Sequence, residues 1–272
     1  MYKTEEEFLS HYDPSEFDRI AITTDILVIS ISDEKSDNYR KTNDKAMSIL
    51  LVKRNNFPFK DKWCLPGGFV RVDEELEKAP ARILENETNI KDIYLEQLYT
   101  FGGVKRDPRM RVISTSYMAL IDKNRMNTEL KNEAKWFKVN YNEEDNLINL
   151  TLTSDEVTLK AVIKKTLKEK TTDRYEFSIV SNDLIAFDHP LVIVSGIERL
   201  KNKLEYTDVV FNMMPKYFTL GELQKVYEVI LNKKLLDPAF RRIIANKVEE
   251  TDEMKTGGGH RPSRLFTYKE GK

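Results

Sequence analysis

The sequence predicts an α/β (α+β) fold, in which a layered domain with a mixed sheet precedes a small helical unit that ends in a hairpin. Segments rich in β-branched residues, which favour strands, recur between residues 20 and 180. Segments with an apolar stripe at helical spacing lie among them and again after residue 215. Three consecutive glycines between basic residues follow near the C-terminus. Strands mixed with helices are typical of layered domains, in which helices cover a sheet.

The composition is that of a globular protein. The 272 residues, 40% hydrophobic and 33% charged, suffice for one large or two ordinary domains with their own cores. No apolar run approaches the roughly 20 residues that span a bilayer, and the acidic N-terminus does not resemble a signal peptide. We therefore expect a cytoplasmic protein without a membrane partner. Cys64 is the one cysteine, which excludes an intrachain disulfide and a Cys-based zinc site.

The order of the elements predicts two domains, at residues 1–205 and 206–272. We expect strands at 20–31, 47–52, 97–101, 112–121 and 134–139, a loop at 32–45, and helices at 76–90 and 191–204. Three further extended segments are expected to form a hairpin or ribbon inserted in the first domain, within residues 141–182: these are 147–152, 158–166 and 175–180.

Charge is distributed unevenly along the chain, although its net value is only −1. Residues 211–272 carry 12 lysines and arginines against 8 aspartates and glutamates, so the preceding part is acidic. A basic C-terminal unit on an acidic body indicates a polyanionic partner for that unit. The alternative is a basic face that is simply solvated.

The first motif begins at Leu65-Pro66-Gly67-Gly68-Phe69-Val70. Glu74 follows Gly68 after five residues, and Arg82 follows after seven more. This spacing resembles the box of the Nudix family, with Leu84, Glu87 and Ile90 at further matching positions. The resemblance implies an α/β/α sandwich with a mixed sheet and a pocket for nucleoside diphosphate derivatives.

The carboxylates that hold Mg²⁺ in the Nudix box are mostly absent. They stand at positions i, i+3 and i+4 of a helix, which share one face. Here these positions are Ile83, Asn86 and Glu87, and Glu85 lies about 200° around the helix from residue 83. Without the metal cluster nothing neutralises charge on a diphosphate or activates water, so we expect no required cofactor and impaired hydrolysis.

A hydrolase of ADP-ribose-like compounds remains the alternative. It would use Mg²⁺ held by Glu87, with Glu74 and with Glu143 or Glu144 as a minimal site. Two other departures concern the fold. Asn89 replaces the glycine that ends the helix and tolerates a left-handed conformation. Pro80 requires a helix that begins close to it.

The pocket residues follow from the same resemblance. The segment from Lys105 to Arg111 looks like one found in Nudix proteins that act on ADP-ribose-like molecules, and arginine suits pyrophosphate. A charged turn is the alternative, and Glu74, Arg82 and Glu87 form either a structural ion-pair set or ligand contacts. Trp63 and Phe69 stack on a base or pack in the core, and Cys64 is expected to pack. The predicted ligand-binding residues are Arg54, Gly67, Gly68, Arg82, Glu87, Arg106 and Arg109.

The second motif begins at Thr219, which forms a predicted capping box with Glu222 at the start of an amphipathic helix. After a turn through residues 232–238, a second helix is predicted at 239–248, with Arg241 and Arg242 near its start. Two short helices joined by a tight turn predict a helix-turn-helix. The three glycines and their basic neighbours suit a wing that reaches over a phosphate backbone.

This segment resembles the DNA-binding domain of the NrtR family of Nudix-related transcriptional regulators. The likeness lies in the Phe-Thr-Leu and Glu-Leu-Gln run, in Phe240-Arg241-Arg242, and in Arg261-Pro262 with Leu265-Phe266. It covers most of the chain except roughly 141–182. It implies a homodimer that binds a palindromic DNA operator and responds to ADP-ribose or a related metabolite.

The resemblance also assigns residues. His189 is expected to be structural, and the predicted DNA contacts are Thr219, Gln224, Lys225, Arg241, Arg242, Lys247, Lys255, His260 and Arg261. A protein-interaction module is the alternative reading of this unit.

Overall fold

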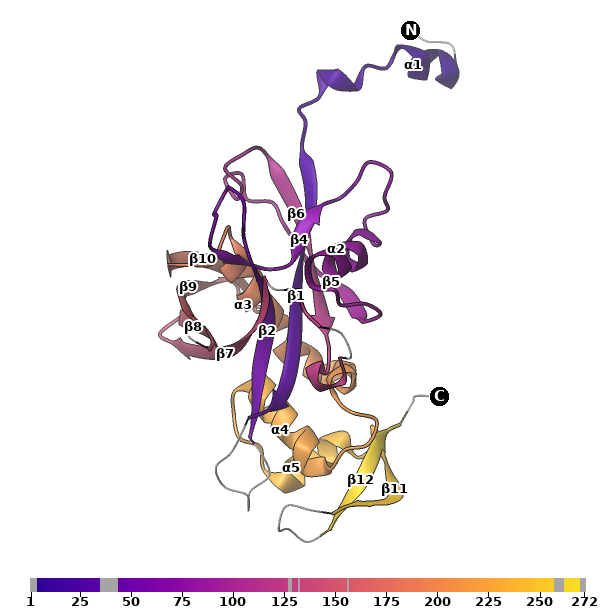
Figure 1. Cartoon of the computed structure of the whole chain (residues 1–272), viewed down its shortest axis with the longest axis vertical. Coiled ribbons are helices and arrows are strands. Elements are labelled where there is room, and N and C mark those ends of the chain that lie inside the picture. The colour runs from indigo at the N-terminus through magenta and orange to yellow at the C-terminus, as the bar shows by residue number, and fades with distance from the viewer. Residues whose placement is uncertain are drawn as a thin grey trace.

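The computed structural model describes residues 4–34, 44–126, 129–131, 133–155, 157–256 and 262–269. One mixed sheet organises the first part of the chain, in the order β10-β9-β8-β7-β2-β1-β6-β5, with β3 on β2 and β4 on β1 (Figure 1). Strands β1 and β6 are parallel, and the other paired strands are antiparallel. The strands are β1 (Ala21–Asp33), β2 (Lys45–Lys53), β3 (Trp63–Cys64), β4 (Gly67–Phe69), β5 (Tyr94–Phe101), β6 (Val112–Leu120), β7 (Ala134–Glu144), β8 (Leu147–Ser154), β9 (Val157–Glu169) and β10 (Arg174–Asn182).

The three segments predicted as a hairpin or ribbon inserted in the first domain are strands, and they pair in sequence order. Strands β8, β9 and β10 continue the central sheet beyond β7. Alternate residues of β8 and β9 are buried, including Ile148, Leu150, Leu159 and Ile163, and they join the core on one face of the sheet. The apolar alternation therefore extends the sheet and its core instead of building an isolated hairpin.

The helices cover both faces of the sheet. Alternate residues of β1 enter different cores: Leu27 and Ile29 pack with α3 (His189–Tyr206), whereas Ile26 and Val28 pack with α2 (Ala79–Thr88). Helix α3 approaches β1 so closely that a Cβ at Gly196 would lie 2.1 Å from Leu27 Cδ2. This arrangement is the predicted α/β/α sandwich. No helix within the described ranges is long and apolar enough to span a membrane.

Helix α2 is shorter than the predicted 76–90 because residues 76–78 form a turn. Its ends follow the predicted rules. Pro80 lies in the first turn, and Asn89 ends the helix with a φ of 69° while its N–H donates to the Glu85 carbonyl. The fold of the box is therefore kept where its residues depart from the family pattern.

The C-terminal unit contains α4 (Leu220–Leu231), α5 (Asp237–Ile244) and a hairpin of β11 (Val248–Lys255) and β12 (Ser263–Tyr268). The capping box of Thr219 and Glu222 is present as predicted. The second helix lies earlier than the predicted 239–248: it ends at Ile244, because Val248 pairs with Tyr268 in the hairpin. The three glycines of the predicted wing lie outside the described residues.

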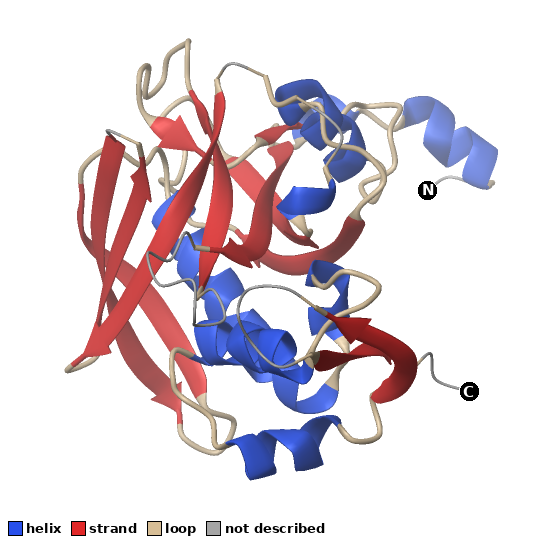
Figure 2. Cartoon of the chain, turned by 60° about the horizontal axis from the view of Figure 1, so that its bottom comes forward, coloured by secondary structure: helices blue, strands red, loops and turns tan. Residues whose placement is uncertain are grey.

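The C-terminal unit packs directly on the sheet domain. The 3₁₀ turn η3 (Val209–Met213), α4 and α5 contribute Val210, Leu223, Ile230 and Phe240 to the same hydrophobic cluster as α3 and β1. Figure 2 shows these helices gathered beside the strands, with the C-terminal hairpin next to them. One continuous core thus joins both parts, and the predicted domain boundary at residue 205 stays a prediction.

The N-terminal segment is the exception to this packing. It contains α1 (Glu5–His11), which has no buried residue, and the 3₁₀ turn η1 (Pro14–Glu16). A further 3₁₀ turn, η2 (Lys123–Arg125), follows β6. Figure 1 shows α1 at the end of an arm that leads away from the sheet.

Candidate functional site

A cavity of about 460 Å³ lies beside the box motif. Strands β1, β3 and β4 line it, together with the C-terminal half of α2. The other walls are the segment that follows β2, the segments that precede β6 and β7, and the residues that lead into α3. Six of the predicted ligand-binding residues line it: Arg54, Gly67, Gly68, Glu87, Arg106 and Arg109. The structure therefore brings six of the seven predicted residues to one cavity, and their contact with a ligand stays a prediction.

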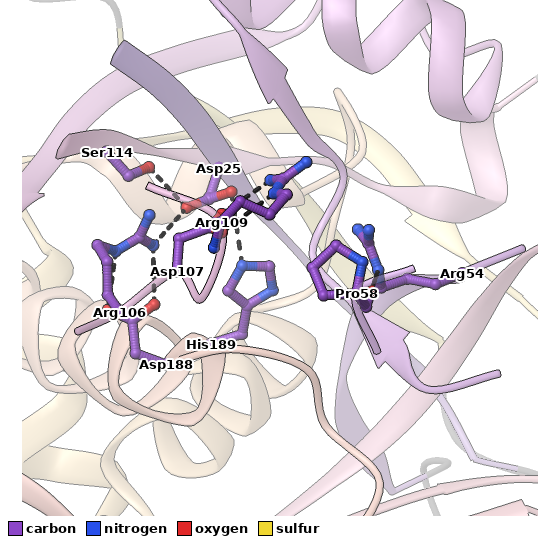
Figure 3. A network of polar contacts seen from close by, with 9 residues as sticks. All are labelled: Asp25, Arg54, Pro58, Arg106, Asp107, Arg109, Ser114, Asp188 and His189. Carbon is purple, nitrogen blue, oxygen red and sulfur yellow. Dashed lines mark hydrogen bonds and ion pairs between the residues drawn. The ribbon is translucent and has the colours of Figure 1, made fainter. Parts of the chain in front are cut away.

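A buried ion-pair network forms one wall of the cavity (Figure 3). Arg106 donates to both carboxylate oxygens of Asp188 at 2.7 and 3.0 Å and to Asp25 at 3.1 Å, and its side chain is only 5% exposed. Ser114 Oγ donates to Asp25 at 2.6 Å. Burial raises the pKa of Asp25, but His189, Arg106 and Ser114 outweigh it and hold that pKa well below its ordinary value. Arg106 thus lines the cavity while it is paired with two carboxylates, and its predicted ligand contact stays a prediction.

His189 links this network to the backbone of the box. Its Nδ1 accepts a hydrogen bond from Leu65 N at 2.9 Å, and its Nε2 lies 3.5 Å from Asp25 Oδ1. The ring is 3% exposed at the first residue of α3. These contacts agree with the predicted structural role of His189, because they tie the start of α3 to β1 and to the box.

Arg54 and Arg109 also line the cavity. Arg54 Nε donates to the Pro58 carbonyl at 2.8 Å, and its guanidinium lies 4.9 Å from the centre of the Phe187 ring. Arg109 pairs with Asp107 at 2.8 Å and lies 5.2 Å from the centre of the half-exposed Phe69 ring. A ligand would meet two guanidinium groups, each held in place by a neighbour.

The aromatic and thiol alternatives separate clearly. Trp63 is buried and packs edge-on against Phe137, so it belongs to the core. Phe69 lines the cavity with 45% of its surface exposed. Burial raises the pKa of the Cys64 thiol to about 12, which fits the predicted packing role.

Arg82 is not a residue of the pocket wall. Its guanidinium donates to both oxygens of Glu74 at 2.5 and 2.6 Å, and to the Phe69 carbonyl at 3.2 Å. Glu74 also accepts from Arg71 N, and the hydrogen bonds from Arg82 lower the pKa of Glu74 to about 2. These two residues form the ion pair that the sequence offered as one alternative, and the pair fastens the loop to α2. The ligand assignment of Arg82 is corrected, because its partner occupies it.

The metal positions of the box do not fit Mg²⁺. Ile83 is buried, and its Cδ1 would lie 3.4 Å from a Cβ at Gly68, so an alkyl side chain fills that position. Asn86 and Glu87 face the cavity, which leaves one carboxylate for a cation that prefers several oxygen ligands. No group of three or more His, Cys, Asp or Glu residues in the described part of the chain could hold a metal ion.

The alternative minimal metal site is also not assembled. Glu74 is held by Arg82, and Glu143 pairs with Lys165 at 3.0 Å on the far strands of the sheet. Burial raises the pKa of Glu87, which Lys131 and Arg54 partly offset. The remnant carboxylates are therefore in three different environments.

The predicted DNA contacts fall into two groups. Thr219 caps α4, and Gln224 donates to the Leu235 carbonyl and to Asp237, which closes the turn between α4 and α5. The remaining lysines have acidic partners: Lys225 pairs with Asp44, Lys247 with Asp208 and Lys255 with Glu222.

Arg241 and Arg242, in contrast, are exposed on α5, whose Phe240 and Ile244 are buried. They are the best placed of the predicted contacts to meet a phosphate backbone. His260 and Arg261 lie outside the described residues.

Comparison with known proteins accounts for both parts of this arrangement. The sequence profile of the NrtR DNA-binding winged helix domain matches residues 210–268, and that of the NUDIX domain matches residues 38–158. The ADPR responsive transcriptional repressor NtrR of Acinetobacter baylyi is 32% identical over 271 residues, which cover 98% of this chain and 89% of the repressor. The chain belongs to the NrtR family.

Solved structures agree with this assignment. A MutT/nudix family protein from Enterococcus faecalis is 25% identical with a TM-score of 0.72, covering 98% of this chain and 94% of that one. Shewanella oneidensis NrtR complexed with a 27mer DNA is 27% identical with a TM-score of 0.63, covering 91% and 93%. The predicted fold, a Nudix sandwich followed by a winged helix-turn-helix, is confirmed.

Several pocket residues of this NrtR family member escaped the sequence analysis. Asp25 had a signal, because Thr23-Thr24-Asp25 interrupts an otherwise apolar strand. A carboxylate inside a buried strand requires a partner, which points to an arginine elsewhere in the chain. Lys131, which also lines the cavity, had no such signal, because it lies outside any patterned segment.

We expect Arg106→Gln to lower the free energy of unfolding by about 3–5 kcal/mol, because it leaves Asp25 and Asp188 without their cation. Urea unfolding followed by tryptophan fluorescence measures this loss. Arg264→Gln is the control, since Arg264 and its partner Glu250 are 55% and 60% exposed, and it should cost less than about 1 kcal/mol. Equal losses in the two variants would contradict the structural role of Arg106.

Proposed function

We propose that the protein is a DNA-binding transcriptional regulator in which the Nudix pocket senses ADP-ribose or a related nucleotide or sugar-phosphate metabolite. The observation that carries this proposal is the state of α2: its fold and its cavity are kept, while Ile83 and Asn86 stand where metal ligands would be. A pocket of this kind can bind a diphosphate, but it lacks the groups that activate water.

The effector class is supported by the chemistry of the cavity wall. Arg54 and Arg109 offer guanidinium forks to phosphate oxygens, and Phe69 offers an exposed aromatic ring. The relative from Acinetobacter baylyi is named an ADPR responsive repressor, which agrees with this chemistry. We propose that no metal or other cofactor is required for binding.

The DNA-binding role is supported by α5. Phe240 and Ile244 fix one face of the helix in the core, so that Arg241 and Arg242 face outward next to the β11–β12 hairpin. A short helix anchored in this way can enter a major groove, and the hairpin can lie over the adjacent phosphates. The similar NrtR of Shewanella oneidensis has been solved with DNA. Because it must reach DNA, we place the protein in the cytoplasm.

We further propose a homodimer that binds a palindromic operator. The N-terminal arm exposes Leu9, Tyr12 and Phe17 at 59%, 47% and 61%, and no residue of α1 is buried. Apolar side chains grouped on an arm mark an interaction surface. A second copy of the chain is a suitable cover, because a two-fold axis would also present two winged helices to two half-sites.

We expect Arg241→Ala with Arg242→Ala to weaken binding to duplex DNA from the protein's own upstream region by about 100-fold or more, since two groove or phosphate contacts are lost. Fluorescence anisotropy at several salt concentrations measures the affinity and its salt dependence. Lys160→Ala with Lys164→Ala removes the same charge from exposed positions on β9 and should bind like the wild type.

The same assay tests the effector. ADP-ribose should change the affinity of the wild type for DNA by at least about 5-fold. The arginine variant should still bind ADP-ribose. Retained DNA binding by that variant would place the DNA contacts at other residues. A wild type without salt-sensitive DNA binding would favour a protein-interaction module instead.

Hydrolysis of ADP-ribose with Mg²⁺ or Mn²⁺ should stay far below about 1 s⁻¹, because the remaining donor set cannot assemble the metal cluster. Chromatographic detection of AMP measures it. Ile83→Glu with Asn86→Glu should increase the affinity for Mn²⁺, followed by its paramagnetic resonance signal, without necessarily restoring turnover. Unchanged Mn²⁺ affinity in a folded variant would show that the box register is wrong.

Light scattering after size exclusion should find a dimer for the wild type. Replacing Leu9, Tyr12 and Phe17 with serine should shift this equilibrium toward the monomer, because the apolar surface of the arm is lost. Leu167→Ser, at a 46% exposed position on β9, is the control and should leave the dimer intact. A dimer unaffected by the arm variant would place the interface elsewhere.

A further inference from the structure

We infer that the ammonium group of Lys131 takes the place of the divalent cation in this pocket, so that a diphosphate is bound without metal. The inference rests on the proposed function, and it names a charge-providing residue that the box motif does not contain. It answers a physical question that the loss of the metal ligands raises. A diphosphate needs a compensating positive charge when it enters a half-enclosed cavity.

The position of Lys131 is the first observation. Lys131 lies in the segment before β7 and lines the cavity with Asn86 and Glu87, the second and third positions of the metal-binding face. Its Nζ donates to the Asn86 carbonyl. A positive charge therefore lies within hydrogen-bond distance of the backbone of Asn86, whose side chain stands at a lost metal-ligand position.

The segment that carries Lys131 is held against α2. Asn89 Nδ2 donates to the Glu129 carbonyl at 3.3 Å, and Ala134 N donates to the Lys131 carbonyl at 2.9 Å. The first bond ties the segment to the end of the helix, and the second closes the turn into β7. Lys131 is thus positioned from both sides and does not depend on its own side-chain contact alone.

The charge balance of the cavity is the second observation. Arg106 is neutralised by Asp25 and Asp188, and Arg109 by Asp107. In the described ranges the hydrogen-bond partner of Lys131 is a carbonyl, and that of Arg54 Nε is likewise a carbonyl, at Pro58. Glu87 and Glu133 also line this wall, but neither forms an ion pair with Lys131 or Arg54 in the described ranges. The two cations therefore have only longer-range carboxylate neighbours and can still pair with a ligand.

A purely structural role for Lys131 is the competing explanation. The last carbonyls of a helix lack intrahelical partners and attract cations, and Asn86 is one of these residues. Such a cap would stabilise α2 without any effect on ligand affinity. The two explanations differ in one measurement, the affinity for a diphosphate at equal protein stability.

An ammonium group in place of a metal ion also agrees with a pocket that senses its ligand and does not hydrolyse it. An ammonium group neutralises a phosphate as a compact point charge. It cannot lower the pKa of a bound water as a metal ion does, so it supplies binding without a nucleophile. The ligand class that this pocket accepts is therefore a metal-free diphosphate, such as the pyrophosphate group of ADP-ribose.

Isothermal titration calorimetry of the full chain with ADP-ribose, in EDTA and in excess Mg²⁺, tests the inference. The dissociation constants of the wild type should agree within about twofold. Lys131→Met should weaken binding by about 10-fold to 100-fold in EDTA, the range expected for a lost charged hydrogen bond. Lys131→Arg should retain most of the affinity, because it keeps the cation.

Lys135→Met is the matched control, since Lys135 is exposed on β7 and is not part of the cavity wall. Thermal unfolding of each variant separates a loss of stability from a loss of affinity. Wild-type binding that collapses in EDTA, or a folded Lys131→Met variant that binds like the wild type, would overturn the inference while leaving the proposed function intact.

Inorganic pyrophosphate separates the failure of the effector from the failure of the inference. If ADP-ribose binds under neither condition, the proposed effector is wrong. Binding of pyrophosphate that needs Lys131 and no metal would then still support the inference. Absence of pyrophosphate binding in both buffers would contradict it.

Discussion

The buried bridge from Asp25 through Arg106 to Asp188 joins the middle of the central strand to the start of α3. Separating these charges would leave carboxylates in the core, which proteins avoid at a cost of several kcal/mol. The bridge therefore fixes the segment before β6 and the entrance of α3 as one unit. The cavity, His189 and the loop of the box all lie against this unit, so its charge balance underlies the geometry of the site.

The pocket keeps the fold of the Nudix box although the box has lost its metal ligands. Pro80 and Asn89 keep the two ends of α2, and the pair of Glu74 and Arg82 keeps the loop in place, although neither feature needs a metal. The positions that do need one have been replaced by an alkyl group and an amide. What remains at this face is a cavity in which Arg54 and Lys131 donate to backbone carbonyls. These groups are suited to binding a phosphate and unsuited to cleaving it.

Residue spacing and local patterns predicted the helices and strands and the segments that line the pocket. The capping box at Thr219 and the left-handed Asn89 are local, and both were predictable because their partners lie within four residues. The partners of Arg106 could not be predicted, because they lie about 80 residues away in either direction and no local pattern records them. The place of β8 to β10 at the β7 edge of the sheet could not be predicted for a related reason: apolar alternation defines a strand but not the strand with which it pairs.

The manner in which the winged helix is attached bears on how the pocket could reach DNA. Helix α3 begins at the buried bridge and leads through η3 into α4, and residues of all three share one hydrophobic cluster with β1. A tethered domain would need its linker to order before a signal could pass, whereas a close-packed core transmits a displacement of one helix to those that touch it. Because Gly196 has no Cβ, α3 lies in direct contact with Leu27 of β1. A displacement at the buried bridge would therefore reach a helix whose opposite end leads into the winged helix.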